Sequence, residues 1–432
     1  MPFLAGRREI ITKRSAPLRI TMRFFQQRPP FVLMVATGAM CTVVVLVFAR
    51  LCYGLVLPAM RDGLGLSYAQ AANLSTATAL GYLLLVMVAG VFAARFGGKQ
   101  SVLLGLVLVT LGFIGLSQAS DYRVLLALMV MLGMGTAFGY TPLISLLANT
   151  YPKRRGSVIG FTNSGVGAGM LLAGALVPAL TQADTSDGWR HVWLSFAAGG
   201  ALVTTLVLLF LRNPERPMAA STDAATGVGG PGEPIFRNPH VVTVGLVYGV
   251  LGLTYIVQVT FMYSFALDGG LTALSAGHLV SLMGILSIFA GPFWGWLADR
   301  LGYSNGLVLS MSLSLLATAL PVIWPQPWAF VAHFVILGLC VAGLFTSILA
   351  ASTETVPPHQ APVAVSFVTL FYATGQFLGP ALAGLVVEWS EGFRVAFAGS
   401  CLVMVGGVYL CWRTRRHQGY RAVPASACAA GE

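Results

Sequence analysis

The chain has 432 residues, of which 56% are hydrophobic and only 9% are charged, and its mean hydropathy is +0.80. This composition excludes an ordinary soluble domain, in which about a quarter of the residues carry charge. The formal net charge of +11 does not indicate nucleic-acid binding, because the basic residues follow the order of the apolar segments instead of forming one patch.

Twelve apolar segments follow one another, each long enough to cross a hydrocarbon core of about 30 Å as a helix. They are long and continuous, which indicates helices and not the short alternating strands of a membrane barrel. The sequence therefore predicts an all-α membrane protein with twelve transmembrane helices. The expected spans are 31–60, 66–94, 101–119, 124–149, 157–181, 191–211, 240–267, 273–298, 306–324, 328–351, 362–387 and 393–412.

The longest polar interruption, 212–239, is rich in Pro, Gly, Ala and Thr and predicts a flexible cytoplasmic linker. It separates a first group of six spans, 31–211, from a second group, 240–412. A basic tail, 1–30, precedes the first group and a second tail, 413–432, follows the last span.

The basic residues predict which side each loop faces. Most of the 25 Lys and Arg lie in the tails, the linker and alternate loops. Arg50 lies inside a span, and four others fall in loops on the opposite side: Arg61, Arg123, Arg190 and Arg394. This positive-inside pattern predicts that both termini are cytoplasmic. The first apolar run is too long for a signal-peptide core, so no cleavage is expected, and the polybasic tail can contact anionic membrane lipid.

No motif indicates catalysis or a cofactor. The six cysteines lack the spacing of a metal site, and the glycine run from Gly165 to Gly169 lies inside an apolar span with no Walker lysine. We therefore expect no cofactor, no metal and no enzymatic activity.

The two groups of spans share an internal repeat. Residues 90–99 follow the second span and read GVFAARFGGK, whereas residues 295–303 follow the eighth and read GWLADRLGY. The match predicts two pseudo-symmetric six-helix bundles that arose by duplication. Three residues recur after 205 positions: Gly90, Arg95 and Gly97 as Gly295, Arg300 and Gly302.

Glycines of the fifth and eleventh spans repeat with an offset of 210. Small residues on one helix face let neighbouring helices pack closely. Membrane helices are rich in glycine anyway, so only the joint spacing supports a duplicated packing face. The residues are Gly165, Gly169 and Gly174 in span five, and Gly375, Gly379 and Gly384 in span eleven.

The loop from Gly295 to Gly302, Gly-x-Leu-Ala-Asp-Arg-x-Gly, resembles the loop motif of the major facilitator superfamily, and the resemblance covers nearly the whole chain. A narrower set of residues resembles the YbfB/YjiJ-type bacterial permeases. It comprises residues 48–60 (FARLCYGLVLPAM), 64–67 (LGLS) and 81–83 (GYL). The resemblance implies alternating access around a central site, and residence in a bacterial inner membrane. We expect a functional monomer.

In that superfamily the loop motif latches the cytoplasmic helix ends. The first copy has Ala94 where an acid is usual, so the role carries over best to Asp299 and Arg300. The alternative is that these charges only orient solvated loops. The full set that the resemblance assigns to the latch is Gly90, Arg95, Gly97, Lys99, Gly295, Asp299, Arg300 and Gly302.

Arg50 is the clearest candidate for substrate binding, because an ionisable residue within a span is by default a functional-site hypothesis. Its guanidinium stays protonated and presents a planar fork of donors that suits a carboxylate. We therefore expect a small anionic substrate. The alternative is that Arg50 snorkels to the outer interface or pairs with helix carbonyls.

The repeat adds neutral partners to this site. A shift of 205 maps Arg50 onto Tyr255 and Tyr53 onto Gln258, and both pairs keep an i, i+3 spacing. We expect the two pairs to face each other across the centre. Weaker additions are Tyr140 and Gln376.

No Asp or Glu lies in the middle of a span, so we consider His278 and His333 as carriers of a coupling proton. Packing or interface roles are the alternative for both histidines. Together these features favour a secondary transporter of a small organic anion, coupled to a proton gradient. A multidrug-type efflux permease and a non-transporting membrane sensor or scaffold stay open as alternatives.

Overall fold

The computed structural model describes residues 31–151, 154–184, 186–213, 235–356 and 360–415. The expected N-terminal tail, nearly all of the linker and the C-terminal tail after Arg415 lie outside the described residues.

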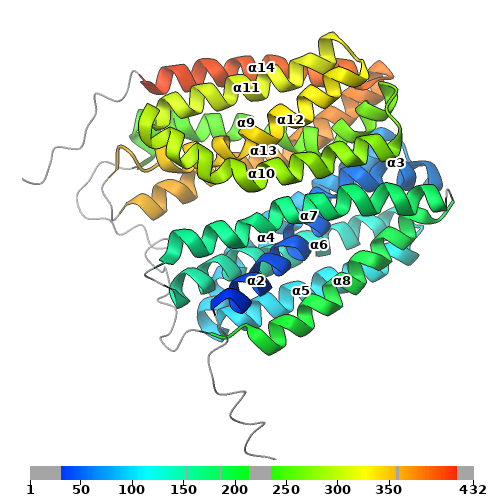
Figure 1. The fold of residues 1–432 in the computed structure, drawn as a ribbon, viewed down its shortest axis with the longest axis horizontal. Coiled ribbons are helices and arrows are strands. Elements are labelled where there is room, and N and C mark those ends of the chain that lie inside the picture. The colour runs from blue at the N-terminus through cyan, green and yellow to red at the C-terminus, as the bar shows by residue number, and fades with distance from the viewer. Residues whose placement is uncertain (1–30, 152–153, 185, 214–234, 357–359, 416–432) are drawn as a thin grey trace, which may run out of the picture.

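The described chain contains twelve helical segments that are long and apolar enough to cross a membrane, arranged in two bundles (Figure 1). The first bundle comprises a broken first segment, α2 (Phe31–Thr42), η1 (Val43–Leu51) and α3 (Tyr53–Leu64), followed by α4 (Tyr68–Phe96), α5 (Gly98–Gln118), α6 (Tyr122–Thr150), α7 (Arg155–Ala183) and α8 (Gly188–Phe210). The second comprises α9 (Pro239–Asp268), α10 (Ala273–Leu301), α11 (Tyr303–Ile323), α12 (Pro327–Ala351), α13 (Ala361–Ser390) and α14 (Phe393–Thr414). The all-α fold with twelve spans is therefore confirmed.

Local sequence explains where several helices begin and turn. Ser67 and Gln70 form a capping box at the start of α4, which satisfies backbone N–H groups that the helix itself leaves free. Gly97 and Gly302 end the two copies of the loop motif with positive φ angles of 101° and 81°. Because L residues with side chains avoid this region, both copies of the repeat need glycine at the turn.

The two bundles also pack their helices in corresponding ways. In the first bundle, a Cβ at Gly133 on α6 would collide with the Thr78 carbonyl of α4. In the second, a Cβ at Gly338 on α12 would lie 3.0 Å from Met283 of α10, and both partners are displaced by 205 residues. This equivalence of helix contacts, and not only of sequence, supports the pseudo-symmetry.

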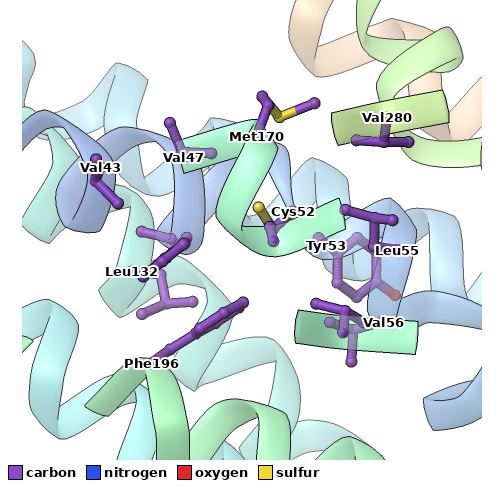
Figure 2. Packing of buried hydrophobic residues seen from close by; sticks show 14 of the residues in the cluster. Val43, Val47, Cys52, Tyr53, Leu55, Val56, Leu132, Met170, Phe196 and Val280 are labelled. Carbon is purple, nitrogen blue, oxygen red and sulfur yellow. The ribbon is translucent and has the colours of Figure 1, made fainter. Parts of the chain in front are cut away.

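The first segment breaks the pseudo-symmetry because its middle, η1, is a π-helix, whereas α9 is an uninterrupted α-helix. The Cys52 N–H donates to the Val47 carbonyl at 2.9 Å, five residues back, and the Thr136 hydroxyl of α6 donates to the Val45 carbonyl at 2.6 Å. Such π segments are rare and concentrate at functional sites. Figure 2 shows the buried side chains around this segment, with Met170 of α7 and Val280 of α10 alongside.

The bundles meet at one end of the molecule and separate toward the other. We call the end that carries the connections 65–67, 119–121, 184–187, 269–272, 324–326 and 391–392 the closed end, and the end where α2 begins and α14 ends the terminal end. In Figure 1 α3 lies between the two bundles at the closed end.

Glycines spaced seven residues apart on α7 and α10 show where the bundles part. We call this series the glycine ladder: Gly174, Gly167 and Gly160 on α7, and Gly277, Gly284 and Gly291 on α10. Near the closed end, Cβ atoms at Gly174 and Gly167 would lie 2.5 Å from the carbonyls of Gly277 and Gly284. Seven residues further toward the terminal end, Cβ atoms at Gly160 and Gly291 would meet nothing within 4 Å. The two helices therefore touch from the closed end to the middle and then part.

Candidate functional site

Arg50 lies in the last turn of η1 and joins the two bundles. Its Nη2 donates to Oε1 of Gln376, which is near the middle of α13. Its guanidinium also lies over the ring of Tyr82 on α4, 4.6 Å from the ring centroid. The sequence named both Arg50 and Gln376, and the structure brings them together.

The first bundle contributes a further pair of polar groups, from α6 and α7. The Tyr140 hydroxyl donates to Oδ1 of Asn163 at 2.9 Å. Asn163 lies two helical turns from the α7 N-terminus, in the part of α7 that diverges from α10. Its side chain is exposed. Tyr140 also interacts electrostatically with Tyr82, which lies under the guanidinium of Arg50, so this pair is linked to the surroundings of Arg50.

The second bundle contributes an aromatic cluster. Tyr372, one turn before Gln376 on α13, stacks on Tyr248 of α9 with centroids 4.4 Å apart. Phe345 of α12 meets Tyr372 and Tyr255 edge-on, at 5.7 and 5.6 Å. Since the Gln376 side chain also hydrogen-bonds to the Tyr372 hydroxyl, one connected group leads from Arg50 into these rings.

The charge of Arg50 has no acidic partner among the described residues. Its polar and aromatic neighbours are Gln376, Tyr82 and Tyr372, all of them neutral. A charge removed from water is costly unless another charge compensates it. The site is therefore a partly buried positive charge that no described residue neutralises. A bound anion could neutralise it.

The other expected residues differ in where they lie: Tyr255 joins the aromatic cluster through Phe345, whereas Tyr53 contacts α4. Tyr53 is 3% exposed and its hydroxyl donates to the Ala71 carbonyl of α4 at 2.8 Å. Tyr255 and Gln258 line a separate small cavity with Leu51 and Leu55. Tyr53 therefore contacts α4 while Gln258 lines the cavity, and the expected facing of the two pairs stays a prediction.

The expected packing glycines contact both their own bundle and the other one. Gly165 and Gly375 approach the first helix of their own halves, at Ala39 and at Gly249, again 210 residues apart. Gly169 packs on Val47 and Gly379 on Leu253. The third pair crosses between bundles: Gly174 packs on Gly277 and Ser281, and Gly384 on Ala72 and Tyr68.

The expected latch residues contact their own bundle at the terminal end. Lys99 donates from Nζ to the Leu208 carbonyl of α8 and from its backbone N–H to Asn213, both at 2.8 Å. Arg95 lies over Phe96 and Arg300 over Trp296. Cβ atoms at Gly90 and Gly295 would meet no atom within 4 Å, and the side chain of Asp299 lies outside the described part of the chain. Latching by these residues stays a prediction.

The two candidate histidines have opposite environments. His278 is exposed near the start of α10, whereas His333 on α12 is completely buried. The sequence placed both at similar depth, and only the packing of α12 against α11 distinguishes them.

A contact that sequence reasoning missed joins the bundles at the closed end. Oε2 of Glu388, near the end of α13, accepts hydrogen bonds from the Ser67 hydroxyl at 2.8 Å and from the Ala69 N–H at 3.0 Å. A carboxylate at the N-terminus of α4 is also favoured by the helix dipole. The Ser75 and Thr260 hydroxyls pair at 3.0 Å further in.

Glu388→Ala is expected to shift the molecule toward a state open at the closed end, because it removes both of these hydrogen bonds. Charged hydrogen bonds of this kind contribute about 1.5–3 kcal/mol, so the shift should be about 10-fold or more. Labelling of an introduced Ser75→Cys, with the native cysteines replaced, measures the shift. Glu388→Gln keeps an acceptor and should show a smaller change. Equal labelling in all three proteins would show that Glu388 does not help to hold the closed end shut.

Sequence reasoning also missed Tyr82, Tyr372, Asn163, Tyr248 and Phe345. Tyr82 belongs to the segment that carried the narrower family resemblance, which was its only signal. The others are neutral residues in apolar spans, where no pattern marks which face turns inward.

Comparison with known proteins gives consistent relatives. A family model described as "Uncharacterised MFS-type transporter YbfB" matches residues 42–410. Human monocarboxylate transporter 11 is 27% identical over 342 residues, covering 75% of this chain and 70% of the relative. Human monocarboxylate transporter 6 is 24% identical over 368 residues, covering 78% and 72%.

Solved structures share the fold. A bacterial homologue of the human lysosomal transporter Spinster, in an inward-facing and unoccupied conformation, superposes with a TM-score of 0.73 at 17% identity, covering 95% of this chain and all of the other. A D-xylose–proton symporter superposes with a TM-score of 0.68 at 13% identity, covering 88% and 96%.

Proposed function

Because the chain belongs to the YbfB-type family of major facilitator superfamily transporters, we propose that it carries a small organic anion, with Arg50 as the group that binds the anion's carboxylate. The transport would proceed by alternating access between the two bundles. We place the terminal end on the cytoplasmic side of a bacterial inner membrane, as the distribution of basic residues indicates.

The observation that carries the proposal is the uncompensated charge of Arg50. Its neighbours Gln376 and Tyr82 solvate the guanidinium without neutralising it. A carboxylate that displaces the Gln376 oxygen would form a charge-assisted, two-pronged pair with the guanidinium. The released Gln376 amide and the Tyr372 hydroxyl would then remain as hydrogen-bonding groups around the anion.

The relatives support the same class of substrate. Several of them are named monocarboxylate transporters, and this chain aligns with most of their length. The aromatic cluster of Tyr248, Tyr372 and Phe345 adds apolar surface beside the charge, which suits a carboxylate on a short organic body.

The arrangement of the bundles supports inward access in this conformation. The α7–α10 glycine ladder is engaged near the closed end and disengaged toward the terminal end. Asn163 and Tyr140, on the disengaged side, would be the first polar groups that a solute entering from the terminal end meets.

The test is uptake of radiolabelled acetate, lactate and pyruvate into proteoliposomes under an imposed gradient. Arg50→Gln keeps a hydrogen-bonding side chain but removes the charge, and we expect uptake to fall at least about 30-fold, since losing one partner of a buried charge pair costs about 2–5 kcal/mol. Arg50→Lys should retain partial activity, because an ammonium keeps the charge without the fork.

Arg123→Gln is the matched control, since Arg123 is exposed at the closed end of α6. It should transport like the wild type. Equal uptake by Arg50→Gln and wild type would reject anion binding at Arg50, and a wild type that moves none of the three anions would reject this substrate class.

A further inference from the structure

A small cavity lies between the bundles, on the closed-end side of Arg50. Its volume is about 30 Å³, which is enough for a water molecule. The first bundle contributes apolar side chains, among them Leu51 and Leu55, and the second bundle contributes every polar one: Tyr255, Gln258, Tyr263 and His333.

Two hydrogen-bond acceptors in the cavity wall have no partner among the described residues. Gln258 is 3% exposed and its Oε1 is unpaired. His333 is 0% exposed, and its Nδ1 lies 2.8 Å from the Ala317 carbonyl of α11. Because a carbonyl can only accept, Nδ1 carries the proton in the neutral ring and Nε2 is a bare lone pair, and this Nε2 is unpaired.

The remaining polar side chains around the cavity are two tyrosines, Tyr255 and Tyr263. The Tyr263 hydroxyl donates to the Ala273 carbonyl at 3.1 Å. The ring of Tyr255 packs against Phe345. Lining residues from α7 and α10, such as Met170, Val280 and Met283, carry no ionisable group, and α11 faces His333 with the Ala317 carbonyl. Among the described residues, no Asp, Glu, Lys or Arg lines the cavity.

This donor set selects among ions. A sodium ion prefers several hard oxygen ligands and a carboxylate, which this wall does not supply. An imidazole nitrogen beside an amide oxygen instead suits a proton, because protonated Nε2 becomes a donor and Oε1 of Gln258, directly or through one water, an acceptor.

We propose that His333 and Gln258 form the coupling-proton site of this transporter, and the proposal rests on the proposed anion transport. Nε2 of His333 takes a proton from a hydronium ion in the water that enters when the closed end opens, becomes an imidazolium hydrogen-bonded toward Gln258, and returns the proton to water on the other side. No other bond changes in this step.

The position of the cavity couples this site to the anion site. Leu51 lines the cavity while the preceding residue, Arg50, reaches Gln376, so consecutive residues of η1 take part in the two sites. The cavity wall comes from both bundles, and any separation of the bundles at the closed end opens it. Two neighbouring positive charges repel, so a carboxylate on Arg50 favours the protonated state of His333 and proton and anion move together.

The first test separates driven uptake from exchange in proteoliposomes that hold pyruvate. Exchange of labelled for unlabelled pyruvate at equal pH needs no net proton movement. Accumulation of label under an inwardly directed proton gradient requires net proton movement. For His333→Gln we expect accumulation, and the proton entry reported by luminal pyranine, to fall at least tenfold more than exchange does. Gln258→Leu should change the same ratio in the same direction.

His191→Gln is the control, because the side chain of His191 on α8 is 56% exposed and is not among the residues that line the cavity. It should keep the wild-type ratio of protons to pyruvate. For His333→Gln, an unchanged ratio of protons to pyruvate, or an equal loss of exchange and accumulation, would overturn the proton site.

A second measurement stands even if the wild type does not carry pyruvate. In protein labelled with ¹⁵N-histidine, the His333 signal is the one missing from His333→Gln. A Cβ at Gly54 would lie 2.8 Å from the Thr260 carbonyl, so Gly54→Ala keeps the closed end apart. In that variant His333 should change from the neutral to the imidazolium pattern as the pH is lowered from 8 to 5, and a ring that stays neutral would overturn the proposal.

Discussion

Gly54→Ala is expected to abolish transport of every substrate, because it prevents the bundles from meeting at the closed end. Gly54 of α3 lies against the backbone of α9, where an added Cβ would collide with the Val259 carbonyl and lie 2.8 Å from the Thr260 carbonyl. Backbone atoms in the middle of a helix cannot move aside as a flexible side chain can. Overpacking of this kind costs about 3 kcal/mol, which disfavours the closed-end contact by about 150-fold.

The measurement is cross-linking of a Ser75→Cys, Thr260→Cys pair, with the native cysteines replaced. The two hydroxyls are 3.0 Å apart when the closed end is shut, so cross-linking should be efficient in the parent and nearly absent with Gly54→Ala. Gly249→Ala on α9 is the control, since its Cβ would lie at an ordinary 3.5 Å from Phe371. Full cross-linking with Gly54→Ala would show that α3 and α9 can rearrange around the extra carbon.

Gly291→Val is expected to abolish transport in the opposite way, by holding the terminal end open. Gly160 and Gly291 continue the seven-residue ladder of Gly167 with Gly284 and Gly174 with Gly277, yet meet nothing within 4 Å in this conformation. When the terminal end shuts, α7 and α10 must approach along the rest of the ladder. A valine there would then meet backbone, at a cost of about 1–3 kcal/mol or more.

The present conformation should tolerate this substitution, which makes the result diagnostic. Thermal stability and closed-end cross-linking should remain at the parent level or above, while uptake falls. Gly406→Val on α14 is the matched control, because a Cβ there also meets nothing within 4 Å but the residue is on an exposed face away from the other bundle. Normal uptake by Gly291→Val would mean that the terminal end shuts without this part of the ladder.

The two variants also test whether one rocking motion serves both ends. Gly54→Ala should raise labelling at the closed end, and Gly291→Val should lower it. A single rigid-body motion requires these opposite effects, because opening one end shuts the other.

The long elements of the fold could be predicted from sequence because they depend on one-dimensional properties. Each span is long and apolar enough to require burial in lipid, and the loop glycines Gly97 and Gly302 repeat where the backbone needs a positive φ. The π-helix could not be predicted, since η1 is an apolar run rich in valine like its neighbours.

The sequence by itself determined the class of protein, its two halves and the presence of one charge, Arg50, in a place where charge is costly. Only the tertiary structure decided what that charge meets. Gln376 and Tyr82 are neutral residues on other helices, and His333 and Gln258 become notable because packing leaves Nε2 and Oε1 unpaired in one cavity. The physical reason is that hydrophobicity acts on every residue of a span alike, whereas hydrogen bonding and charge pairing depend on which faces of distant helices meet.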